Sequence, residues 1–196
     1  MKRLFDIFAS GCGLLVLSPL FLLLAIWIKL DSKGPIFYKQ IRVGRNNKDF
    51  YLLKFRSMRV GSDKKGLITV GERDPRITSS GYFIRKYKLD ELPQLINVFC
   101  GDMSLVGPRP EVRKYVDMYT SEQMKVLSVR PGITDLASIR YRNENELLAM
   151  AENPDQYYVD VIMQDKLRIN LEYVANHSFW YDIKLIFNTF WVIIAK

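Results

Sequence analysis

The chain is poor in the residues that most often build metal clusters and hydrolytic triads. Its 196 residues include two cysteines and one histidine. The cysteines, Cys12 and Cys100, are far apart, and Cys12 lies in an apolar run, so we expect neither a disulfide nor a metal cluster. This usage fits a reducing cytoplasm. A Ser-His-Asp or Cys-His mechanism would depend on His177 alone, and nothing around it in the sequence indicates a nucleophile. We therefore expect His177 to be structural.

Acidic residues are outnumbered as well. The chain has 29 Lys and Arg against 21 Asp and Glu, which gives a formal net charge of +8. Such a balance favours an anionic partner, which would be nucleic acid, a phospholipid surface or a phosphorylated substrate. The basic stretches contain aromatic residues, but they carry no RNA- or DNA-binding signature, and we expect no nucleic-acid partner. The sequence also lacks internal repeats and low-complexity tracts.

Charge is missing altogether from residues 7–28, an apolar run long enough to span a bilayer as one helix. Basic residues flank this run on both sides: Lys2, Arg3, Lys29, Lys33, Lys39, Arg42, Arg45 and Lys48. Cationic flanks tend to stay on the cytoplasmic side, so a single crossing would place one of the two clusters on the wrong side.

The Ser18-Pro19 pair divides the apolar run into two halves. Proline removes a helical hydrogen bond, and each half of about ten residues would extend about 15 Å, half of the hydrocarbon core. We predict a re-entrant helix-break-helix that enters the membrane and returns. The freed backbone groups would be bonded by the Ser18 hydroxyl or by packed neighbours. A signal peptide, a spanning helix with a proline kink and a buried soluble helix are the alternatives, although no small-residue cleavage site follows Leu30.

The rest of the chain indicates an α+β fold that is predominantly helical with a small β-hairpin. We predict the hairpin from two short strands, 36–39 and 50–55, joined by a turn-forming segment. A loop is expected over 60–78 and another over 101–110. Apolar periodicity and capping residues predict helices over 79–88, 90–100, 111–127 with a break near Ser121, 144–152 and 155–175. Ser79 or Ser80 is expected to cap the first of these helices.

The final segment, 178–195, carries several aromatic residues among isoleucines and a few polar residues. This pattern is typical of an amphipathic helix in the membrane interface, and a terminal helix that packs on the core is the alternative. We therefore divide the chain into a membrane helix (1–30), a cytoplasmic domain (31–177) and a C-terminal interfacial helix (178–196).

Two adjacent carboxylates, Asp90 and Glu91, stand where a helix is predicted to begin. Backbone N–H groups and the helix dipole stabilise negative charge at such a place, so we expect Asp90 as N-cap and Glu91 in the first turn to stay ionised. An ionised carboxylate can ligate Mg²⁺ or attack phosphorus. Simple helix capping is the alternative.

The segment 101–110 (GDMSLVGPRP) contains Gly107 and two prolines, which predict a stiff loop that presents Arg109. A fixed guanidinium can clamp a phosphate with two parallel hydrogen bonds. A rigid connector with a solvated arginine is the alternative. The further candidates for binding phosphate or substrate, each of which is otherwise a solvated surface charge, are Arg42, Lys54, Arg76, Arg85 and Arg130.

Taken together, these segments are more specific than any one of them. Residues 54–58 (KFRSM), 89–95 (LDELPQL), 101–110 and 130–134 (RPGIT) resemble, in the same order, the motifs of the bacterial sugar transferase family, the monotopic polyprenol-phosphate phosphoglycosyl transferases. Ser18-Pro19 is similar to the break in the re-entrant helix of that family. The resemblance covers nearly the whole chain, whose size is similar to that of the small members, which carry only the catalytic unit.

The resemblance implies a reaction and a place in the cell. An Asp-Glu dyad would work with Mg²⁺, with Asp90 as nucleophile and Glu91 assisting with the metal and with protons. Asp90 would attack the β-phosphorus of a UDP-sugar and expel UMP. Undecaprenyl phosphate would then attack the phosphosugar-aspartate in a ping-pong sequence. This is the first membrane step of surface glycoconjugate synthesis, on the cytoplasmic face of a bacterial inner membrane.

Several points stay open at this level. Many relatives continue the RPGIT segment with Gly-Leu-Ala-Gln, whereas this chain has Asp135 in place of the glycine, which leaves the sugar undetermined. A homodimer is left open too. A scaffold that binds anionic lipid without catalysis, and a sugar transferase that releases UDP, are the alternative functions.

Overall fold

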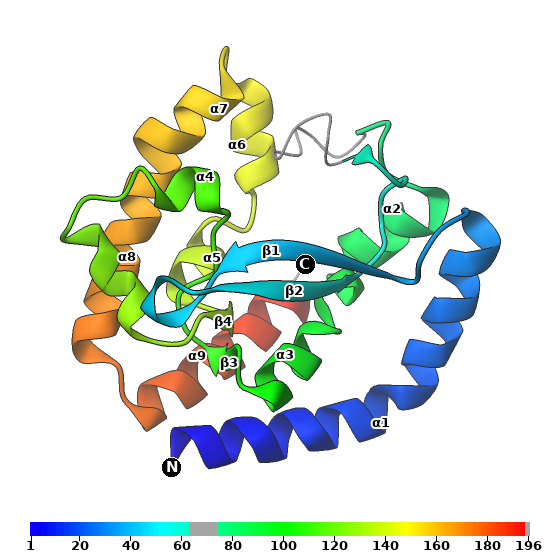
Figure 1. Ribbon diagram of the computed structural model, residues 1–196, viewed down its shortest axis with the longest axis horizontal. Coiled ribbons are helices and arrows are strands. Elements are labelled where there is room, and N and C mark those ends of the chain that lie inside the picture. Colours follow the sequence, from blue (N-terminus) through cyan, green and yellow to red (C-terminus); the bar gives the residue numbers. More distant parts are fainter. Residues whose placement is uncertain (63–73, 195–196) are drawn as a thin grey trace.

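The computed structural model describes residues 1–62 and 74–194, and most of the predicted loop over 60–78 lies outside these residues. The described part is mostly helical with a small antiparallel hairpin, as predicted (Figure 1). Its order is α1 (Lys2–Asp31), β1 (Phe37–Val43), η1 (Arg45–Asn47), β2 (Asp49–Phe55), α2 (Ser79–Lys86), η3 (Leu89–Glu91), α3 (Gln94–Cys100), β3 (Ser104–Val106), α4 (Arg113–Val116), η4 (Gln123–Ser128), β4 (Gly132–Thr134), α5 (Leu136–Arg140), α6 (Glu144–Met150), α7 (Pro154–Tyr157), the π-helical η5 (Tyr158–Ile162), α8 (Met163–Asn176) and α9 (Phe179–Ile194).

The apolar run forms α1, a single bent helix that contains Pro19 (Figure 1). Proline has no N–H to donate to the carbonyl of Leu15, four residues earlier. The Ser18 hydroxyl donates to that carbonyl instead, at 2.8 Å. The helix assignment continues from Lys2 to Asp31, so the predicted break is a bend within one helix, and its freed carbonyl is bonded by the predicted residue.

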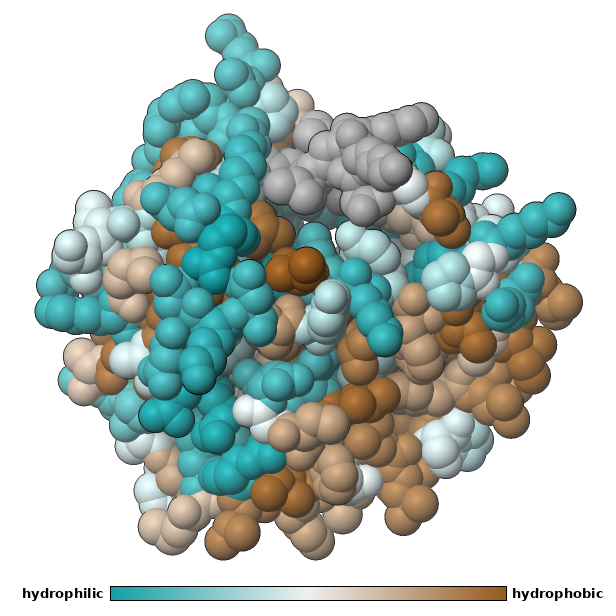
Figure 2. Space-filling model, in the orientation of Figure 1, coloured by the Kyte–Doolittle hydropathy of each residue, from teal (hydrophilic) through white to brown (hydrophobic). Residues whose placement is uncertain are grey.

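Among the described residues, α1 is the one helix that is long and apolar enough to cross a membrane by length and composition. Only 11% of the most apolar 18-residue stretch of α1 is buried inside the protein, so most of its apolar side chains point outward. Figure 2 shows hydrophobic surface along this edge of the molecule and hydrophilic surface over α4, α7 and α8. This surface fits a membrane-associated helix.

Polar contacts join the first turns of α1 to α3 and β3. The Arg3 guanidinium donates to the carbonyls of Val98, at 2.6 Å, and Phe99, at 2.9 Å, near the C-terminal end of α3. The buried Asp6 carboxylate accepts the backbone N–H of Leu105 in β3 at 3.1 Å. The start of α1 is thereby attached to α3 and β3.

The other end of α1 is attached to α2 and β2. Arg56, just after β2, donates to the carbonyls of Ile28, at 3.0 Å, and Ser32, at 2.6 Å. Asp31 accepts both the backbone N–H of Ser80, at 2.9 Å, and its hydroxyl, at 2.7 Å. Each end of the membrane helix therefore contacts one end of the α2–α3 segment.

Two local predictions around α2 and the hairpin need correction. The N-cap of α2 is Thr78, whose hydroxyl accepts the N–H of Gly81 at 3.0 Å, and neither Ser79 nor Ser80. The strands of the hairpin are longer than predicted, with Phe37 opposite Phe55 at the open end. Antiparallel pairing lets each strand extend as far as its partner does, which short-range composition does not reveal.

The predicted loop over 101–110 contains a strand that sequence reasoning missed. β3 pairs in parallel with β4, with Ser104 opposite Gly132 and Val106 opposite Thr134. The two backbones approach so closely that a Cβ added to Gly132 would lie 2.1 Å from the backbone N of Gly107. Strands of three residues are too short to show a period of two, and this pairing joins distant segments.

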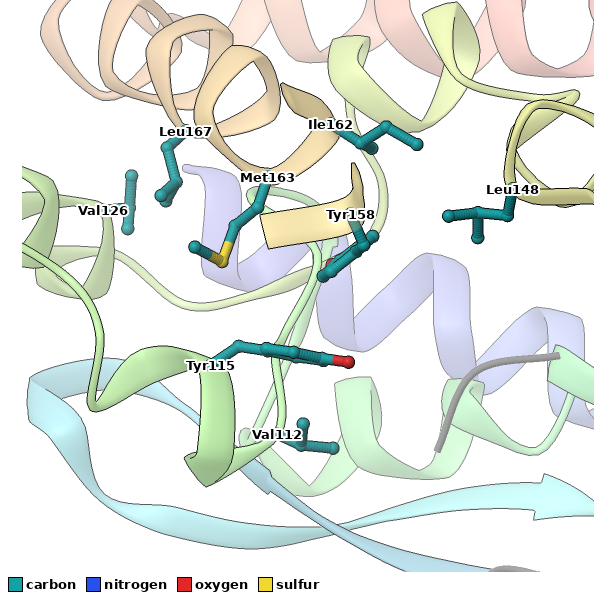
Figure 3. Packing of buried hydrophobic residues seen from close by; sticks show 8 residues of the cluster. All are labelled: Val112, Tyr115, Val126, Leu148, Tyr158, Ile162, Met163 and Leu167. Carbon is teal, nitrogen blue, oxygen red and sulfur yellow. The ribbon is translucent and has the colours of Figure 1, made fainter. Parts of the chain in front are cut away.

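The segment 112–167 packs around one hydrophobic core (Figure 3). Here the predicted helix over 111–127 is α4 followed by η4, with a turn between them, and the predicted helix over 155–175 is α7, η5 and α8. Tyr115 of α4 and Tyr158 of η5 contact each other with ring centroids 4.8 Å apart. The buried members of this core are Val112, Tyr115, Val126, Leu148, Tyr158, Ile162, Met163 and Leu167.

The C-terminal helix α9 has one packed face and one exposed face. Leu185 is buried against Val106 and Tyr173, so one face packs on the core. Trp180, Phe187 and Trp191, spaced by seven and four residues, are all exposed on the other face. An interfacial aromatic helix requires such a face.

Candidate active site

The two acidic residues follow a sharp change of direction between α2 and α3. α2 ends at Lys86, and Lys88 then adopts a left-handed conformation with φ of 57°. The 3-10 turn η3 starts at Leu89, and the N–H of Glu91 donates to the Lys88 carbonyl at 3.3 Å. A left-handed residue ends one helix and lets the chain begin another in a new direction. Asp90 and Glu91 therefore lie at the start of a helical segment, as predicted.

Neither carboxylate acts as a helix cap. The residue before η3 is Lys88, and the residue before α3 is Pro93, and neither position carries a side-chain capping bond. The prediction of Asp90 as N-cap is therefore wrong, and so is the capping alternative. α3 begins four residues later than Asp90, at Gln94.

Glu91 is held by two cations from different parts of the chain. The Arg109 guanidinium donates to both of its oxygens, with one of these distances 3.2 Å, and the Lys54 ammonium donates to Oε1 at 3.1 Å. Burial alone would raise the pKa of Glu91, but the charges of Arg109 and Lys54 hold this pKa well below its usual range. Glu91 is thus ionised, with Arg109 and Lys54 as the cause.

Asp90 has a different environment, although it is the next residue in the chain. It is 6% exposed, and no donor within the described part of the chain forms a hydrogen bond to its carboxylate. Burial raises the pKa of Asp90, Lys54 opposes this rise, and the Glu91 anion adds to it. The expectation that a helix start would favour its charge is not met. Its oxygens keep their lone pairs available for a metal ion or for phosphorus.

The loop that carries Arg109 is braced by the β3–β4 pair. The N–H of Gly107 donates to the Thr134 carbonyl at 3.1 Å, and the N–H of Gly132 donates to the Pro108 carbonyl at 3.0 Å. The Arg109 side chain is 33% exposed while it bonds to Glu91. It is therefore a fixed guanidinium with an open side, and the alternative of a solvated arginine on a connector does not describe it.

The remaining candidate cations divide into two groups. Arg42 donates to the Pro110 carbonyl at 2.9 Å beside the Arg109 loop, and Arg85 of α2 is close enough for its charge to act on Asp90. Arg76 is instead engaged by Asp74 through Nε, at 2.9 Å, and Nη2, at 2.6 Å. Arg130 donates to the Gly101 carbonyl at 2.9 Å, at the end of α3 away from the dyad.

A small polar pocket beside Arg109 contains residues that were not singled out as site residues. Asp135, flagged only as a departure from relatives, lines it and caps α5 by accepting the N–H of Ser138 at 2.8 Å. Asn170 of α8 lines it too, and its buried Oδ1 has no hydrogen-bond partner among the residues that the structure describes. The sequence pattern of α8 indicates only which of its residues pack on the core. No sequence signal could therefore have found Asn170.

Asp90 and Glu91 were predicted to hold a metal ion, but both oxygens of Glu91 already accept hydrogen bonds from Arg109 and Lys54. The described residues contain no cluster of three or more His, Cys, Asp or Glu. Mg²⁺ is usually held by one or two carboxylates together with waters and substrate phosphates, because it retains part of its hydration shell. The unbonded oxygens of Asp90 suit this mode of binding. The residues therefore fit a Mg²⁺ ion that a phosphorylated substrate helps to hold.

Comparisons with known proteins place these residues in a wider context. A family model described as "Bacterial sugar transferase" matches residues 1–196. The chain is 40% identical over 196 residues to the UDP-N-acetylgalactosamine-undecaprenyl-phosphate N-acetylgalactosaminephosphotransferase of Aeromonas hydrophila, covering 96% of this chain and 42% of that protein.

Two further relatives are similar over the same share of this chain. The UDP-glucose:undecaprenyl-phosphate glucose-1-phosphate transferase of Escherichia coli K12 is 37% identical, with 96% of this chain and 39% of that protein covered. The exopolysaccharide production protein PSS of Rhizobium leguminosarum bv. phaseoli is 40% identical, with 96% and 92% covered. The chain thus spans about two fifths of the first two relatives and nine tenths of the third.

Proposed function

This chain belongs to the bacterial sugar transferase family, and we propose that it transfers a phospho-sugar from a UDP-sugar to undecaprenyl phosphate and releases UMP. The printed names of two relatives combine a UDP-sugar with undecaprenyl phosphate, which supports this pair of substrates. The observation that carries the proposal is the buried Asp90 carboxylate, which accepts no hydrogen bond from the described residues and lies beside a Glu91 that two cations neutralise. This pairing provides a nucleophile next to bound positive charge.

In the first half-reaction, Asp90 acts as the nucleophile. One of its oxygens forms a bond to the β-phosphorus of the UDP-sugar, and the bond from that phosphorus to the bridging oxygen breaks. UMP leaves with the bonding electron pair, and the sugar phosphate stays on Asp90. Arg109 presents its open side to the phosphate oxygens, where charge develops during the reaction.

In the second half-reaction, a phosphate oxygen of undecaprenyl phosphate attacks the same phosphorus. The Asp90–phosphorus bond breaks, the carboxylate is regenerated, and the product is a polyprenol diphosphate sugar. Glu91 keeps Arg109 and Lys54 in place through both steps. The lowered pKa of Glu91 makes it a weak base. We therefore assign Glu91 the role of holding the two cations rather than that of transferring protons. The dyad would hold Mg²⁺, and the ion would supply positive charge that offsets the negative charge of the phosphate oxygens.

The location that we propose is the cytoplasmic face of a bacterial inner membrane. The outward apolar side chains of α1, its bend and the exposed aromatic face of α9 support an enzyme that enters one leaflet. Single cysteines at positions 1 and 33, placed in a chain whose own Cys12 and Cys100 are replaced by serine, should both be inaccessible from the periplasmic side of spheroplasts. Periplasmic labelling at position 1 would support the spanning alternative. Pro19→Ala should straighten α1, because the new N–H can bond to Leu15.

The reaction is tested by incubating the protein with a panel of UDP-sugars, with and without undecaprenyl phosphate. We expect UMP up to about one per enzyme from the correct UDP-sugar alone, and continuous release once the lipid is added. Chelation of Mg²⁺ should stop both. Release of UDP instead of UMP would identify a transferase that moves the sugar without its phosphate. Release of neither nucleotide would favour the scaffold that binds anionic lipid without catalysis. The panel also identifies the sugar.

A further inference from the structure

α2 presents an aromatic face to the outside that the donor reaction does not use. Its inward residues, Ser80, Gly81 and Ile84, are buried. Tyr82, Phe83 and Tyr87 point the other way, and their side chains are 40%, 45% and 51% exposed. Tyr82 and Phe83 of α2, together with Tyr87 at its C-cap, form a surface that apolar material can cover.

This face is continuous with the exposed apolar surface of α1. The Trp27 ring lies 5.3 Å from the Phe83 ring, and the Phe83 ring lies 4.7 Å from the Tyr87 ring, between centroids. Figure 1 shows α2 beside the C-terminal arm of α1. We call Trp27, Phe83 and Tyr87 the aromatic row. The row leads from the membrane helix toward the residues that precede the dyad.

Lysines stand at the end of the aromatic row. The Lys86 ammonium lies 5.7 Å from the centre of the Tyr87 ring. Lys88 is exposed, and within the described part of the chain its ammonium has no hydrogen bond or ion pair. By contrast, Lys54 and Arg109 are both bonded to Glu91.

The conformation of Lys88 also requires an explanation. Its φ of 57° belongs to the left-handed region, which glycine adopts without strain and lysine does not. Residues held in such conformations cluster at functional sites. Lys88 precedes Asp90 by two residues, and its charge acts on both Asp90 and Glu91. A phosphate at its ammonium would therefore lie close to the dyad.

We propose that the aromatic row and Lys88 form the acceptor site, where an isoprenoid chain lies along the row and its terminal phosphate is bound by the Lys88 ammonium. This inference rests on the proposed function and deepens it. A phosphate monoester needs a cation that is not already paired, and an isoprenoid needs an apolar path from the membrane. The row provides the apolar path and Lys88 provides the cation, in the segment that leads from α2 to the dyad.

The test compares the two half-reactions of the full chain in nanodiscs of neutral phosphatidylcholine. Lys88→Gly removes the ammonium and relieves the backbone strain, so this variant should fold at least as well as the natural protein. We expect this variant to keep a UMP burst of about one per enzyme from UDP-sugar alone, and its KM for undecaprenyl phosphate to rise about tenfold. Lys88→Arg should keep most of the affinity. Lys48→Ala, at an exposed lysine in the distant hairpin turn, is the matched control and should match the natural protein.

The aromatic row is tested with acceptors of two lengths. Phe83→Gln should raise the KM for undecaprenyl phosphate several-fold and leave that for a short, soluble prenyl phosphate unchanged, whereas Lys88→Gly should raise both. Natural kinetics in Lys88→Gly would overturn the proposal. So would variants that lose only binding to vesicles of anionic phosphatidylglycerol, because that result assigns the surface to bulk phospholipid. Absence of a UMP burst in the natural protein would refute the proposed function instead.

Discussion

The dyad separates two regions that treat a carboxylate in opposite ways. On the Glu91 side, Arg109 from the loop between β3 and α4 and Lys54 from β2 form hydrogen bonds with both oxygens of one carboxylate. On the Asp90 side, no hydrogen-bond donor of the described chain reaches the carboxylate. The first region, which we call the closed region, fixes charge in place. The second, which we call the open region, leaves a carboxylate free to react.

The difference also explains why the buried ion pairs are present at all. Removing charges from water costs several kcal/mol for each ion, so a buried pair is weak evidence for stability. A fixed anion that holds Arg109 near the reacting atoms has a functional use instead. The following substitutions alter one region at a time, in order of decreasing effect on turnover.

The largest effect is expected from Asp90→Asn, which removes the free carboxylate of the open region. Because the Asp90 side chain makes no capping bond, an amide of the same shape should leave the fold intact. We expect the donor-dependent UMP burst to disappear, as measured by quantifying UMP after mixing with UDP-sugar alone. Thermal unfolding of the variant provides the control, and full activity of Asp90→Asn would contradict the proposed nucleophile.

Glu91→Gln acts on the closed region and should affect both activity and stability. It leaves Arg109 and Lys54 without their anion, and an uncompensated buried charge costs about 3–5 kcal/mol. We expect a loss of turnover greater than about a hundredfold, because the cations lose their fixed positions. The melting temperature should also fall, unlike that of Asp90→Asn. Equal melting temperatures of the two variants would argue against the difference between the regions.

Arg109→Ala removes two of the hydrogen bonds that Glu91 accepts, together with the donor that faces the phosphate oxygens. The loss of one such donor costs about 3 kcal/mol at the barrier, or roughly a hundredfold in rate. Arg109→Lys should restore only part of this, because an ammonium cannot bridge two oxygens in one plane. Steady-state UMP release measures both variants. Unchanged kinetics in the pair would show that the Arg109 loop is only a connector.

Lys54→Ala should have the smallest effect of the four. Glu91 would lose one charged hydrogen bond and keep the two from Arg109, so we expect a loss of about tenfold in turnover. The same assay, with Lys48→Ala as the matched surface control, measures it. A larger loss than that of Arg109→Ala would indicate that Lys54 contacts substrate directly and would change the description of the closed region.

The sequence predicts the elements that depend on local pattern. The apolar run of α1, the role of Ser18 beside Pro19 and the hairpin all follow from composition and from the chemistry of proline. The adjacent acids and Arg109 were found as motifs. Their pairing in space was not, because it depends on β3 and β4, two short strands that lie about thirty residues apart. Charge environments also depend on such contacts, so the raised pKa of Asp90 could not be predicted from a helix start.

The contacts at the two ends of α1 have a consequence for the order of synthesis. Arg3 is translated 95 residues before Val98, whose carbonyl it binds. At about 5–20 residues per second, a ribosome needs about 5–20 s to produce that partner. During this interval α1 lacks its protein contacts, whereas the bond from Ser18 to Leu15 is internal to the helix and available at once. The bend can therefore form first, and the later segments of the chain can then assemble on a helix that already has its shape.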